Sequence, residues 1–566
     1  MKYLITSALP YINGVKHLGN IIGSLLPADV YSRFLRQQGL DVLFICGTDE
    51  HGTPAEIAAS EEKLEVSAYC ESMYFKQKEI YKKFNIDFDY FGRSSSESNH
   101  KLTREIFSNL DRNGYINEEN INQFYSVDDK RYLPDRYVVG TCPYCKYTKA
   151  RGDQCDLCGK LLDPVELIDP KSAISGSSNL EVKTVTHLFL ALDKLEEKVK
   201  AWLQKKESGW PVYSVSVAKK WLNEGLQPRC ISRDLDWGIS IPKKDYDKKV
   251  FYVWFDAPMA YIAITQDWAR DIAKNDDEWK KWWCKDLDNT RYVQFMAKDN
   301  LPFHGVMWPA MLLGADADKW KTVDCLKGFH WLTYEGGKFS TSLKRGIFSD
   351  VAIEIFPADY WRYYLLANIP ETNDSDFRLE DFVNTVNKDL VGVLGNFVNR
   401  VCALVNKYFD GQVPDYDVEN EYVLMLKNHC LPLAENIQED YFNPNFRSLM
   451  RNLRELWCFG NEFITIIEPW KLVKSDMKAA GNALAACLHL IRLYSIASYP
   501  VIPASAIKML NHLPLPEHSS KAKFKLVESV KFDYLKPGGR LGCVELLFEK
   551  IMPEKLLELQ EIFLSA

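Results

Sequence analysis

The sequence predicts an α/β fold: a doubly wound parallel sheet, split by an insertion and followed by a helical bundle. Three observations predict it. Apolar segments at 2–8 and 41–46 flank an amphipathic stretch, which is the strand–helix–strand order of such a sheet. Four cysteines lie inside a stretch, 116–240, that changes character. From 386 to about 530 the apolar residues keep a helical period.

The first strand, 2–8, leads through a loop at 10–16 into a helix reaching about Gln38. Pro27 is expected to kink or interrupt this helix, because proline removes a backbone donor. The second strand closes on Gly47–Gly52. Ligands of doubly wound sheets bind at the carboxyl ends of the strands, so both loops are expected to lie near a ligand.

Later segments extend this plan. Residues 62–115 are expected to be helical, and strands are expected at 251–255, 292–296 and 543–548, with a last helix at 553–564. The expected division is: first half of the sheet domain, 1–115; inserted connective subdomain, 116–240; second half of the sheet domain, 241–325; linking subdomain, 326–385; helical domain, 386–530; tail returning to the core, 531–566.

Composition is that of an ordinary globular chain, with 46% hydrophobic and 26% charged residues among 566. A net charge of −7 does not exclude a nucleic-acid partner, because such binding needs only a local basic face. The N-terminus has no signal-peptide pattern, and no apolar run approaching a membrane span is expected. We therefore expect a cytoplasmic protein that does not contact a membrane, with free thiols.

Two Cys-x-x-Cys hooks, Cys142/Cys145 and Cys155/Cys158, have the spacing of a zinc site. Four thiolates fill a tetrahedron and leave no position for water or substrate. The sequence therefore predicts one structural Zn²⁺ rather than a catalytic metal.

Two further elements carry candidate chemistry. His17 and Asn20 lie on the first turn of a helix, where backbone N–H groups favour phosphate, and Gly19 leaves room for a flat base. Gly336–Ser342 is a Gly-rich loop with Lys338 and three hydroxyls, able to fold over a polyphosphate. Taken alone, the first is more often a cap and the second an ordinary basic turn.

Together, H-L-G-N at 17–20 and K-F-S-T-S at 338–342 resemble the paired signatures of class I aminoacyl-tRNA synthetases, usually H-I-G-H and K-M-S-K-S. Other motifs narrow the resemblance to the methionyl-tRNA synthetases: A-L-P-Y-I-N at 8–13, G-T-D-E-H-G-T at 47–53, Y-L-P-D-R-Y at 132–137, E-L-I-D-P-K-S at 166–172, Y-V-W-F-D-A-P at 252–258 and F-H-G-V-M-W-P at 303–309. The resemblance runs from residue 1 to about 480.

Two positions depart from the usual signatures. Asn20 replaces the second histidine, and Thr341 replaces the second lysine, whose charge Lys344 or Arg345 would have to supply. Both variants look closer to the archaeal and eukaryotic style of the family.

The resemblance implies a Rossmann-type catalytic domain that activates L-methionine with ATP and Mg²⁺ and then charges tRNA. It implies catalytic roles for His17, Asn20 and Lys338, and ATP binding by these three with Gly19, Ser340, Thr341 and Ser342. It implies a methionine pocket formed by Leu9, Tyr11, Asp49, Trp254, Ala257, Pro258, Tyr261, Asp299, His304 and Trp308. Within it, Asp49 is expected to hold the ammonium group, and Tyr261 and the Leu9 N–H to reach the sulfur.

The resemblance also implies that the helical domain binds the anticodon of initiator and elongator methionine tRNAs through Asn396, Arg400 and Trp470. A monomer is expected. Two other classes stay open: a non-catalytic RNA-binding protein that kept the fold, and a small-molecule nucleotidyltransferase. Methionine-dependent ATP–pyrophosphate exchange tests the first, and tRNA binding tests the second.

Overall fold

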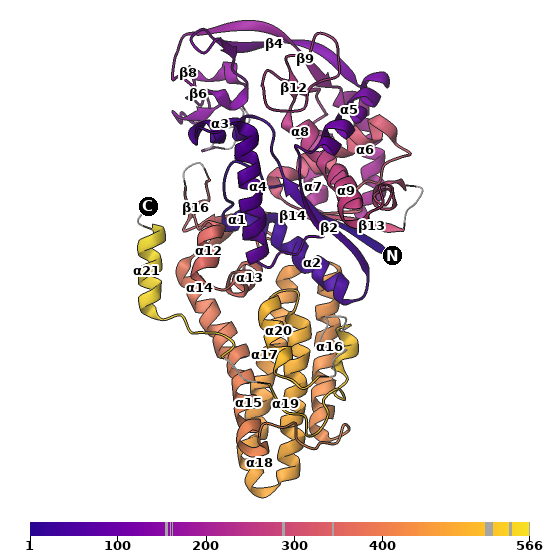
Figure 1. The fold of residues 1–566 in the computed structure, drawn as a ribbon, viewed down its shortest axis with the longest axis vertical. Helices are drawn as coiled ribbons and strands as arrows, with labels where there is room; N and C mark the ends of the chain where they lie inside the picture. The colour runs from indigo at the N-terminus through magenta and orange to yellow at the C-terminus, as the bar shows by residue number, and fades with distance from the viewer. Residues whose placement is uncertain are drawn as a thin grey trace.

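A computed structural model describes residues 1–564, apart from 153–154, 156, 159, 161, 286–288, 342–343, 516–524 and 543–545. In Figure 1 the helical domain forms the lower part, and the inserted strands arch over the sheet domain at the top. The C-terminal helix, α21 (Pro553–Leu564), lies apart from the bundle, beside α12 (Ser349–Ile355) and α14 (Leu379–Thr385).

The central sheet has five parallel strands in the order β14-β13-β1-β2-β3. Their bounds are β1 Lys2–Ser7, β2 Asp41–Thr48, β3 Tyr90–Arg93, β13 Thr290–Ala297 and β14 Cys325–Phe329. The chain leaves β1 toward β2 on one side and returns as β13 on the other. The carboxyl ends of β1 and β13 therefore form the switch point at which such sheets bind ligands.

Side chains alternate between two cores across this sheet. Tyr3 and Ile5 pack into one core, whereas Leu4 packs into the other. Helices around the sheet are α2 (Leu26–Gln37), α3 (Thr53–Glu61), α4 (Val66–Lys83), α5 (Glu97–Arg112), α8 (Val253–Asp256), α9 (Ala260–Trp268), α10 (Lys280–Trp283), α11 (Trp308–Asp316) and α13 (Ala358–Ala367). Because both faces are covered, the strands are nearly continuous runs of apolar residues.

The insertion contains longer elements than its sequence indicated. Two antiparallel strands of eleven residues, β4 (Ile116–Ser126) and β9 (Leu180–Leu190), pair along their whole length. Their sheet is completed by β5 (Arg131–Tyr132) and β10 (Arg229–Cys230), and two helices follow β9, α6 (Leu192–Lys206) and α7 (Val212–Asn223). A separate small sheet holds β6 (Val138–Thr141), β7 (Ala150–Arg151) and β8 (Ile168–Ser172).

Several local expectations were wrong. Residues 62–115 contain the parallel strand β3 between two helices. Only Val250–Phe251 (β12) is extended near 251–255; it pairs with β11 (Ser232–Arg233), and Val253–Asp256 is helical. No strand occurs at 546–548, the described part of the strand expected at 543–548. By contrast, the helix expected from His17 is interrupted near Pro27, as predicted, by a π-helical segment, Ile21–Leu25 (η1), before α2 begins at Leu26.

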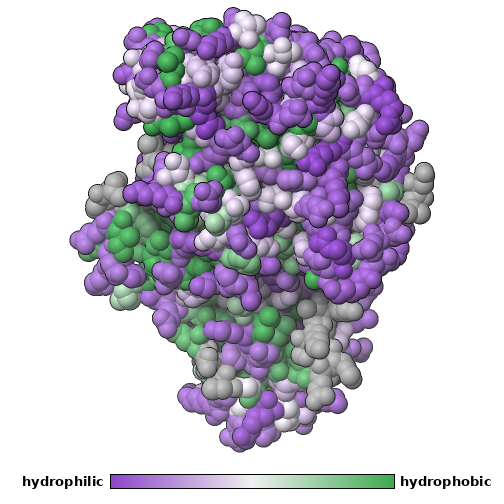
Figure 2. Space-filling model, turned by 45° about the horizontal axis from the view of Figure 1, so that its top comes forward, coloured by the Kyte–Doolittle hydropathy of each residue, from purple (hydrophilic) through white to green (hydrophobic). Residues whose placement is uncertain are grey.

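The helical domain is a bundle whose long members are α15 (Asn396–Phe409), α16 (Glu421–Phe442), α17 (Phe446–Ile467) and α19 (Met477–Ser498), with shorter α18 (Pro469–Ser475) and α20 (Pro503–Asn511). A π-helical segment, Val386–Gly395, leads into it. Contrary to the expectation from sequence, α19 is long and apolar enough to cross a membrane. However, 89% of its apolar window is buried, as for the core helix of a bundle. The surface seen in Figure 2 is mostly hydrophilic, with smaller apolar areas.

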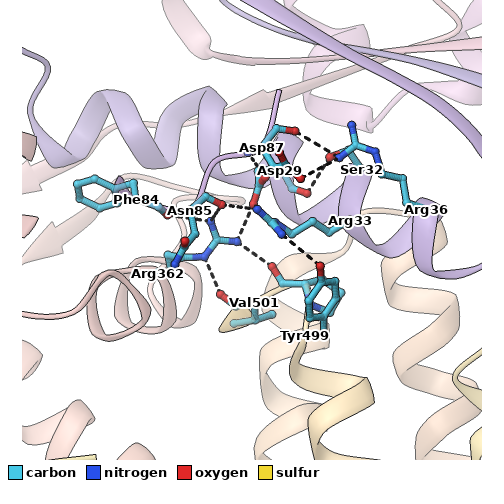
Figure 3. A network of polar contacts seen from close by, with 11 residues as sticks. Asp29, Ser32, Arg33, Arg36, Phe84, Asn85, Asp87, Arg362, Tyr499 and Val501 are labelled. Carbon is cyan, nitrogen blue, oxygen red and sulfur yellow. Dashed lines mark hydrogen bonds and ion pairs between the residues drawn. The ribbon is translucent and has the colours of Figure 1, made fainter. Parts of the chain in front are cut away.

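A buried ion-pair network joins the sheet domain to this bundle (Figure 3). Arg362 on α13 donates to the Asp29 carboxylate on α2 at 2.7 Å and has no exposed side-chain surface. The same guanidinium donates to the backbone oxygens of Phe84, Asn85, Pro500 and Val501. Arg33 adds a second bond to Asp29 at 2.8 Å. The helix that begins at His17 is thereby fixed to the end of α19.

Candidate active site

A cavity of about 320 Å³ opens at the carboxyl ends of β1 and β13. Its walls come from the loop after β1, the turn at His17, the segment after β13, Trp254 and the strands β15 (Leu332–Tyr334) and β16 (Gly337–Lys338). Among the expected residues it is lined by Leu9, Tyr11, His17, Gly19, Asn20, Trp254, Asp299 and Lys338. Residues far apart in sequence therefore meet at the switch point of the sheet.

His17 and Asn20 form a reciprocal cap at the start of α1 (Leu18–Asn20). The Asn20 N–H donates to His17 Nδ1, and the His17 N–H donates to Asn20 Oδ1, both at 3.3 Å. This arrangement leaves the Asn20 side-chain NH₂ as a donor, because its oxygen is occupied. His17 and Asn20 are thus a helix cap, as such residues usually are at this position. This role leaves donors free for a ligand.

The imidazole of His17 is held in its neutral form. Burial lowers its pKa to about 3, and the neighbouring Lys16 ammonium contributes to the shift. Because Nδ1 accepts from the Asn20 N–H, the ring proton resides on Nε2. The side chain can therefore offer one N–H donor at neutral pH, but no positive charge.

The second signature folds onto the first. Phe339 stacks on His17, and Lys338 Nζ lies 5.1 Å from the centre of the Trp331 ring in the cavity wall. Beyond them, Ser340 and Arg345 exchange backbone hydrogen bonds at 3.0 and 2.9 Å, which closes the tip of a hairpin. Ser340 and Thr341 do not line the cavity, and Ser342 lies outside the described residues.

Two glycines make this close approach possible. A Cβ at Gly19 would lie 3.0 Å from His17 Nδ1 and 3.2 Å from Phe339, so a side chain there would push the two rings apart. Gly346 has φ +119°, and a Cβ there would lie 2.1 Å from Phe339.

Arg345 does not face the cavity. Its guanidinium donates to the backbone oxygens of Lys338 and Tyr334, at 3.1 and 3.0 Å. Lys344 is exposed in the same hairpin. Of the two residues suggested to replace the missing lysine, Arg345 is thus engaged within the loop itself.

The expected methionine pocket divides into a wall and a backing. Leu9, Tyr11, Trp254 and Asp299 line the cavity; the buried residues that do not are Asp49, Ala257, Pro258, Tyr261, His304 and Trp308. Tyr261 Oη lies 3.1 Å from His304 Nε2 and also accepts from the Leu9 N–H. The two donors expected to reach a sulfur therefore contact each other.

Asp49 is buried at the end of β2, and its Oδ1 has no hydrogen-bond partner. Burial raises the pKa of this carboxyl well above its usual range, and the nearby acids Asp256 and Glu50 raise it further. The Lys16 ammonium acts in the opposite direction. An unsatisfied buried acceptor of this kind favours an incoming cationic donor.

Sequence reasoning missed several residues of the site. Lys16 lines the cavity although it is 4% exposed, and burial lowers its pKa to about 7. Phe339 lies inside a quoted signature but was given no role. Trp331 and His330 also line the cavity, and their only signal was nearness to the loop in sequence.

Comparisons with known proteins agree with this geometry. The family model described as tRNA synthetases class I (M) matches residues 3–402, and that of the anticodon binding domain of methionyl tRNA ligase matches 419–566. A methionine–tRNA ligase 1 from Acaryochloris marina is 50% identical over 560 residues, covering 99% of both chains. A methionine–tRNA ligase from Streptomyces avermitilis is 49% identical over 571 residues, again covering 99% of both.

The chain belongs to the methionyl-tRNA synthetase family. It is a ligase that attaches methionine to tRNA, and no observation on the described residues favours the non-catalytic alternative. The structure of Mycobacterium tuberculosis methionyl-tRNA synthetase in complex with methionyl-adenylate shares the fold, with a TM-score of 0.77 at 24% identity, over 97% of this chain and 99% of that one. The expected archaeal and eukaryotic style of the signatures stays a prediction.

The four cysteines of this synthetase come together in the insertion. Their Sγ atoms all lie within 4.8 Å of one another, with 3.5 Å between Cys145 and Cys155. Each hook is held by a turn: the Cys142 N–H donates to Tyr147 O, and the Cys155 N–H to Lys160 O. Tetrahedral zinc with bonds of ~2.3 Å needs sulfurs ~3.8 Å apart, so the donor set and its spacing fit one Zn²⁺.

Two of the three residues expected to bind the anticodon, Arg400 and Trp470, meet at the end of the synthetase's bundle. The Arg400 guanidinium lies 4.5 Å from the centre of the Trp470 ring. Asn396, one turn earlier on α15, donates to Asn461 Oδ1 of α17 at 3.3 Å. Trp470 is only partly buried, so part of its ring is available to a ligand.

Proposed function

We propose that the cavity at the switch point forms methionyl-adenylate from ATP and L-methionine. The contact between the two signatures carries the proposal, because it surrounds one cavity with neutral donors, a lysine and an apolar wall. The methionine carboxylate would attack the α-phosphorus, and the bond to pyrophosphate would break. The acyl group would then pass to a hydroxyl of the terminal adenosine of tRNA.

Phosphate contacts are assigned to His17, Asn20 and Lys338. The Nε2–H of His17 and the side-chain NH₂ of Asn20 would donate to phosphate oxygens, and Lys338 would neutralise charge that develops on them. Gly19 would admit the adenine ring. Mg²⁺ would enter with ATP, as part of that substrate. The Ser340 and Thr341 hydroxyls, now outside the cavity wall, would serve only if the hairpin tip moved toward the phosphates.

Methionine is assigned to the other end of the cavity. Its thioether would lie against Leu9, Tyr11 and Trp254, since aromatic faces pair well with a polarizable sulfur. Asp299 would contact its polar end, and Asp49, which lies behind the cavity wall, would hold the ammonium group through its unsatisfied oxygen only if the wall opened toward it. Ala257, Pro258, Tyr261, His304 and Trp308 would support this wall from behind.

Methionine-dependent ATP–pyrophosphate exchange tests the assignment. Lys338→Gln should lower kcat by about 10²–10³, the usual effect of removing one charge-stabilising donor. Lys101→Gln, at a lysine of α5 that is 73% exposed and does not line the cavity, is the control and should stay within about twofold of the wild type. Equal losses in the two variants would contradict the role of Lys338.

One Zn²⁺ is proposed at Cys142, Cys145, Cys155 and Cys158. Four thiolates saturate the ion, so it would stabilise the inserted subdomain and take no part in the chemistry. Cys142 and Cys155 are buried in a small core with Phe124 of β4 and Val250 of β12, which supports this structural role.

The remaining assignments concern partners and place. Asn396, Arg400 and Trp470 are proposed to bind the anticodon of both initiator and elongator methionine tRNAs, because unstacked bases favour aromatic and guanidinium surfaces. We assign a monomer, and we propose the same domain boundaries as those expected from the sequence. We also assign the protein to the cytoplasm, since no disulfide joins any of the described cysteines.

A further inference from the structure

Outside the active site, a cluster of ionisable side chains surrounds one thiol at the base of the insertion. Cys230 ends β10, and it lies beside His187 of β9 and Arg233 of β11. Arg233 Nη1 donates to Cys230 Sγ at 3.2 Å, and the Cys230 thiol lies 3.5 Å from Ser232 O, to which it donates when protonated. None of these residues takes part in the ligation reaction described above.

The surroundings of His187 favour its protonated form. Its Nδ1 lies 2.8 Å from Ser232 Oγ and 3.0 Å from Ser232 O. Its Nε2 lies 3.1 Å from Gln123 Oε1 and 3.1 Å from Asp234 Oδ2. Because acceptor oxygens face both ring nitrogens, both can donate, which is the pattern of an imidazolium. Burial alone would lower the pKa of His187. The interactions with Asp234 and Cys230 outweigh burial, so the pKa of His187 is raised.

The charges around Cys230 favour a thiolate. Burial acts to raise its pKa, but the interactions with His187 and with the Arg233 guanidinium outweigh burial and lower it. The other ionisable groups facing this pair are Lys249, whose Nζ lies 3.3 Å from His187 Nε2, the Asp234 carboxylate, and the Tyr246 hydroxyl. Cys230 remains partly exposed, so a small reagent can reach it.

We propose that Cys230 is a peroxide-reactive thiol, activated by His187 and Arg233 and oxidised by hydroperoxides to a sulfenic acid. The thiolate sulfur attacks one oxygen of hydrogen peroxide, an S–O bond forms and the O–O bond breaks. The sulfur loses two electrons and the peroxide gains them. The leaving hydroxide takes the proton of the His187 imidazolium and departs as water, which balances the step.

The wild-type, zinc-loaded enzyme provides the first test. It is treated with hydrogen peroxide and dimedone at pH 7, and each cysteine peptide is quantified by mass spectrometry. Cys458 is the internal control, because it is also partly exposed but burial raises its pKa. Cys230 should be labelled at least about tenfold faster, since each pKa unit changes the thiolate fraction about tenfold. Equal or slower labelling of Cys230 would overturn the proposal.

Variants test whether the cluster causes the reactivity. Arg233→Gln and His187→Gln should each slow the labelling of Cys230 by about tenfold. Arg229→Gln is the matched control, because Arg229 lies over the Trp221 ring and no bond joins it to the thiol among the contacts described. Unchanged labelling in both Arg233→Gln and His187→Gln, at a wild-type Tm, would show that the cluster does not activate Cys230. The wild-type comparison stands if either variant fails to fold.

Discussion

Phe339 stacks on the imidazole of His17, with ring centroids 4.7 Å apart and ring planes 17° apart. This contact joins the two signatures directly. Phe339 also packs on Tyr334, whose hydroxyl donates to Phe563 O of the C-terminal helix at 3.1 Å. The position of the loop thus depends on packing that reaches the end of the chain.

Replacing Phe339 by alanine should release the loop from His17. We expect pyrophosphate exchange to fall by about 10–100-fold, because Lys338, the preceding residue, would lose the position from which we propose that it contacts the phosphates. Phe339→Leu should retain more activity, since it keeps part of the apolar contact. Phe75→Ala removes a phenylalanine that is 56% exposed and is the control. Wild-type exchange rates for Phe339→Ala would show that the stacking has no role in catalysis.

Trp470→Ala should separate tRNA charging from adenylate formation. The ring and the Arg400 guanidinium form one surface at the tip of the bundle. Losing a stacked base contact costs about 1–3 kcal/mol, so kcat/KM for tRNA should fall about 5–150-fold. Pyrophosphate exchange should not change. Ile466→Ala removes a side chain of the neighbouring helix α17 that is 70% exposed, and it should affect neither assay. A parallel loss of exchange in Trp470→Ala would exclude the assignment.

Zinc removal should loosen the insertion without destroying the sheet domain. Cys155→Ser, with Cys155 1% exposed, should abolish zinc binding measured by atomic absorption and increase proteolysis within 116–240. Exchange activity should decrease but persist. Cys284→Ser, at a partly exposed cysteine outside the cluster, should keep one zinc per chain. Complete loss of exchange with intact sheet-domain peptides would indicate a catalytic metal instead.

The main architecture could be predicted from the sequence because long, regular patterns of apolar residues specify it. The strands around β1, β2 and β13 and the bundle helices were confirmed. Strand β3 was missed because only four residues, Tyr90–Arg93, form it. Residues 253–256 are rich in β-favouring aromatics, yet the Phe255 N–H donates to Tyr252 O and the segment turns into a helix.

The site was predictable by residue type but not by position. The family motifs identified Tyr261, His304 and Trp308, but sequence cannot tell a cavity wall from the layer behind it. The packing of Phe339 on His17 and the burial of Lys16 arise only when distant segments meet. The same holds for Cys230, His187 and Arg233, which come from three different strands.

Arg362→Met should destabilise the junction between the sheet domain and the bundle. Arg362 and Asp29 are both fully buried, so removing Arg362 leaves Arg33 as the remaining ion-pair partner of Asp29 and deprives four backbone oxygens of a donor. We expect a loss of about 3–5 kcal/mol. Arg36→Met breaks the ion pair between Arg36 and Asp89, whose side chains are 27% and 32% exposed, respectively. This change should lower the free energy of unfolding by at most about 1 kcal/mol. Calorimetry of thermal unfolding compares the two variants. Equal shifts in Tm would contradict the prediction that the buried pair stabilises the protein more than the exposed pair.

The stability of the enzyme should fall as the pH drops below about 6.5, partly because buried histidines must be protonated. Burial lowers the pKa of His489 to about 3 and that of His304 to about 4. Between those values and 6.5 the unfolded chain binds protons that the folded chain does not, so unfolding is favoured as pH falls. His489→Gln should therefore reduce the fall in Tm between pH 7 and pH 4.5, since it removes one such proton. His429→Gln, at an exposed histidine, is the control and should leave the fall in Tm unchanged. An unchanged fall in Tm for His489→Gln would show that His489 does not contribute to it.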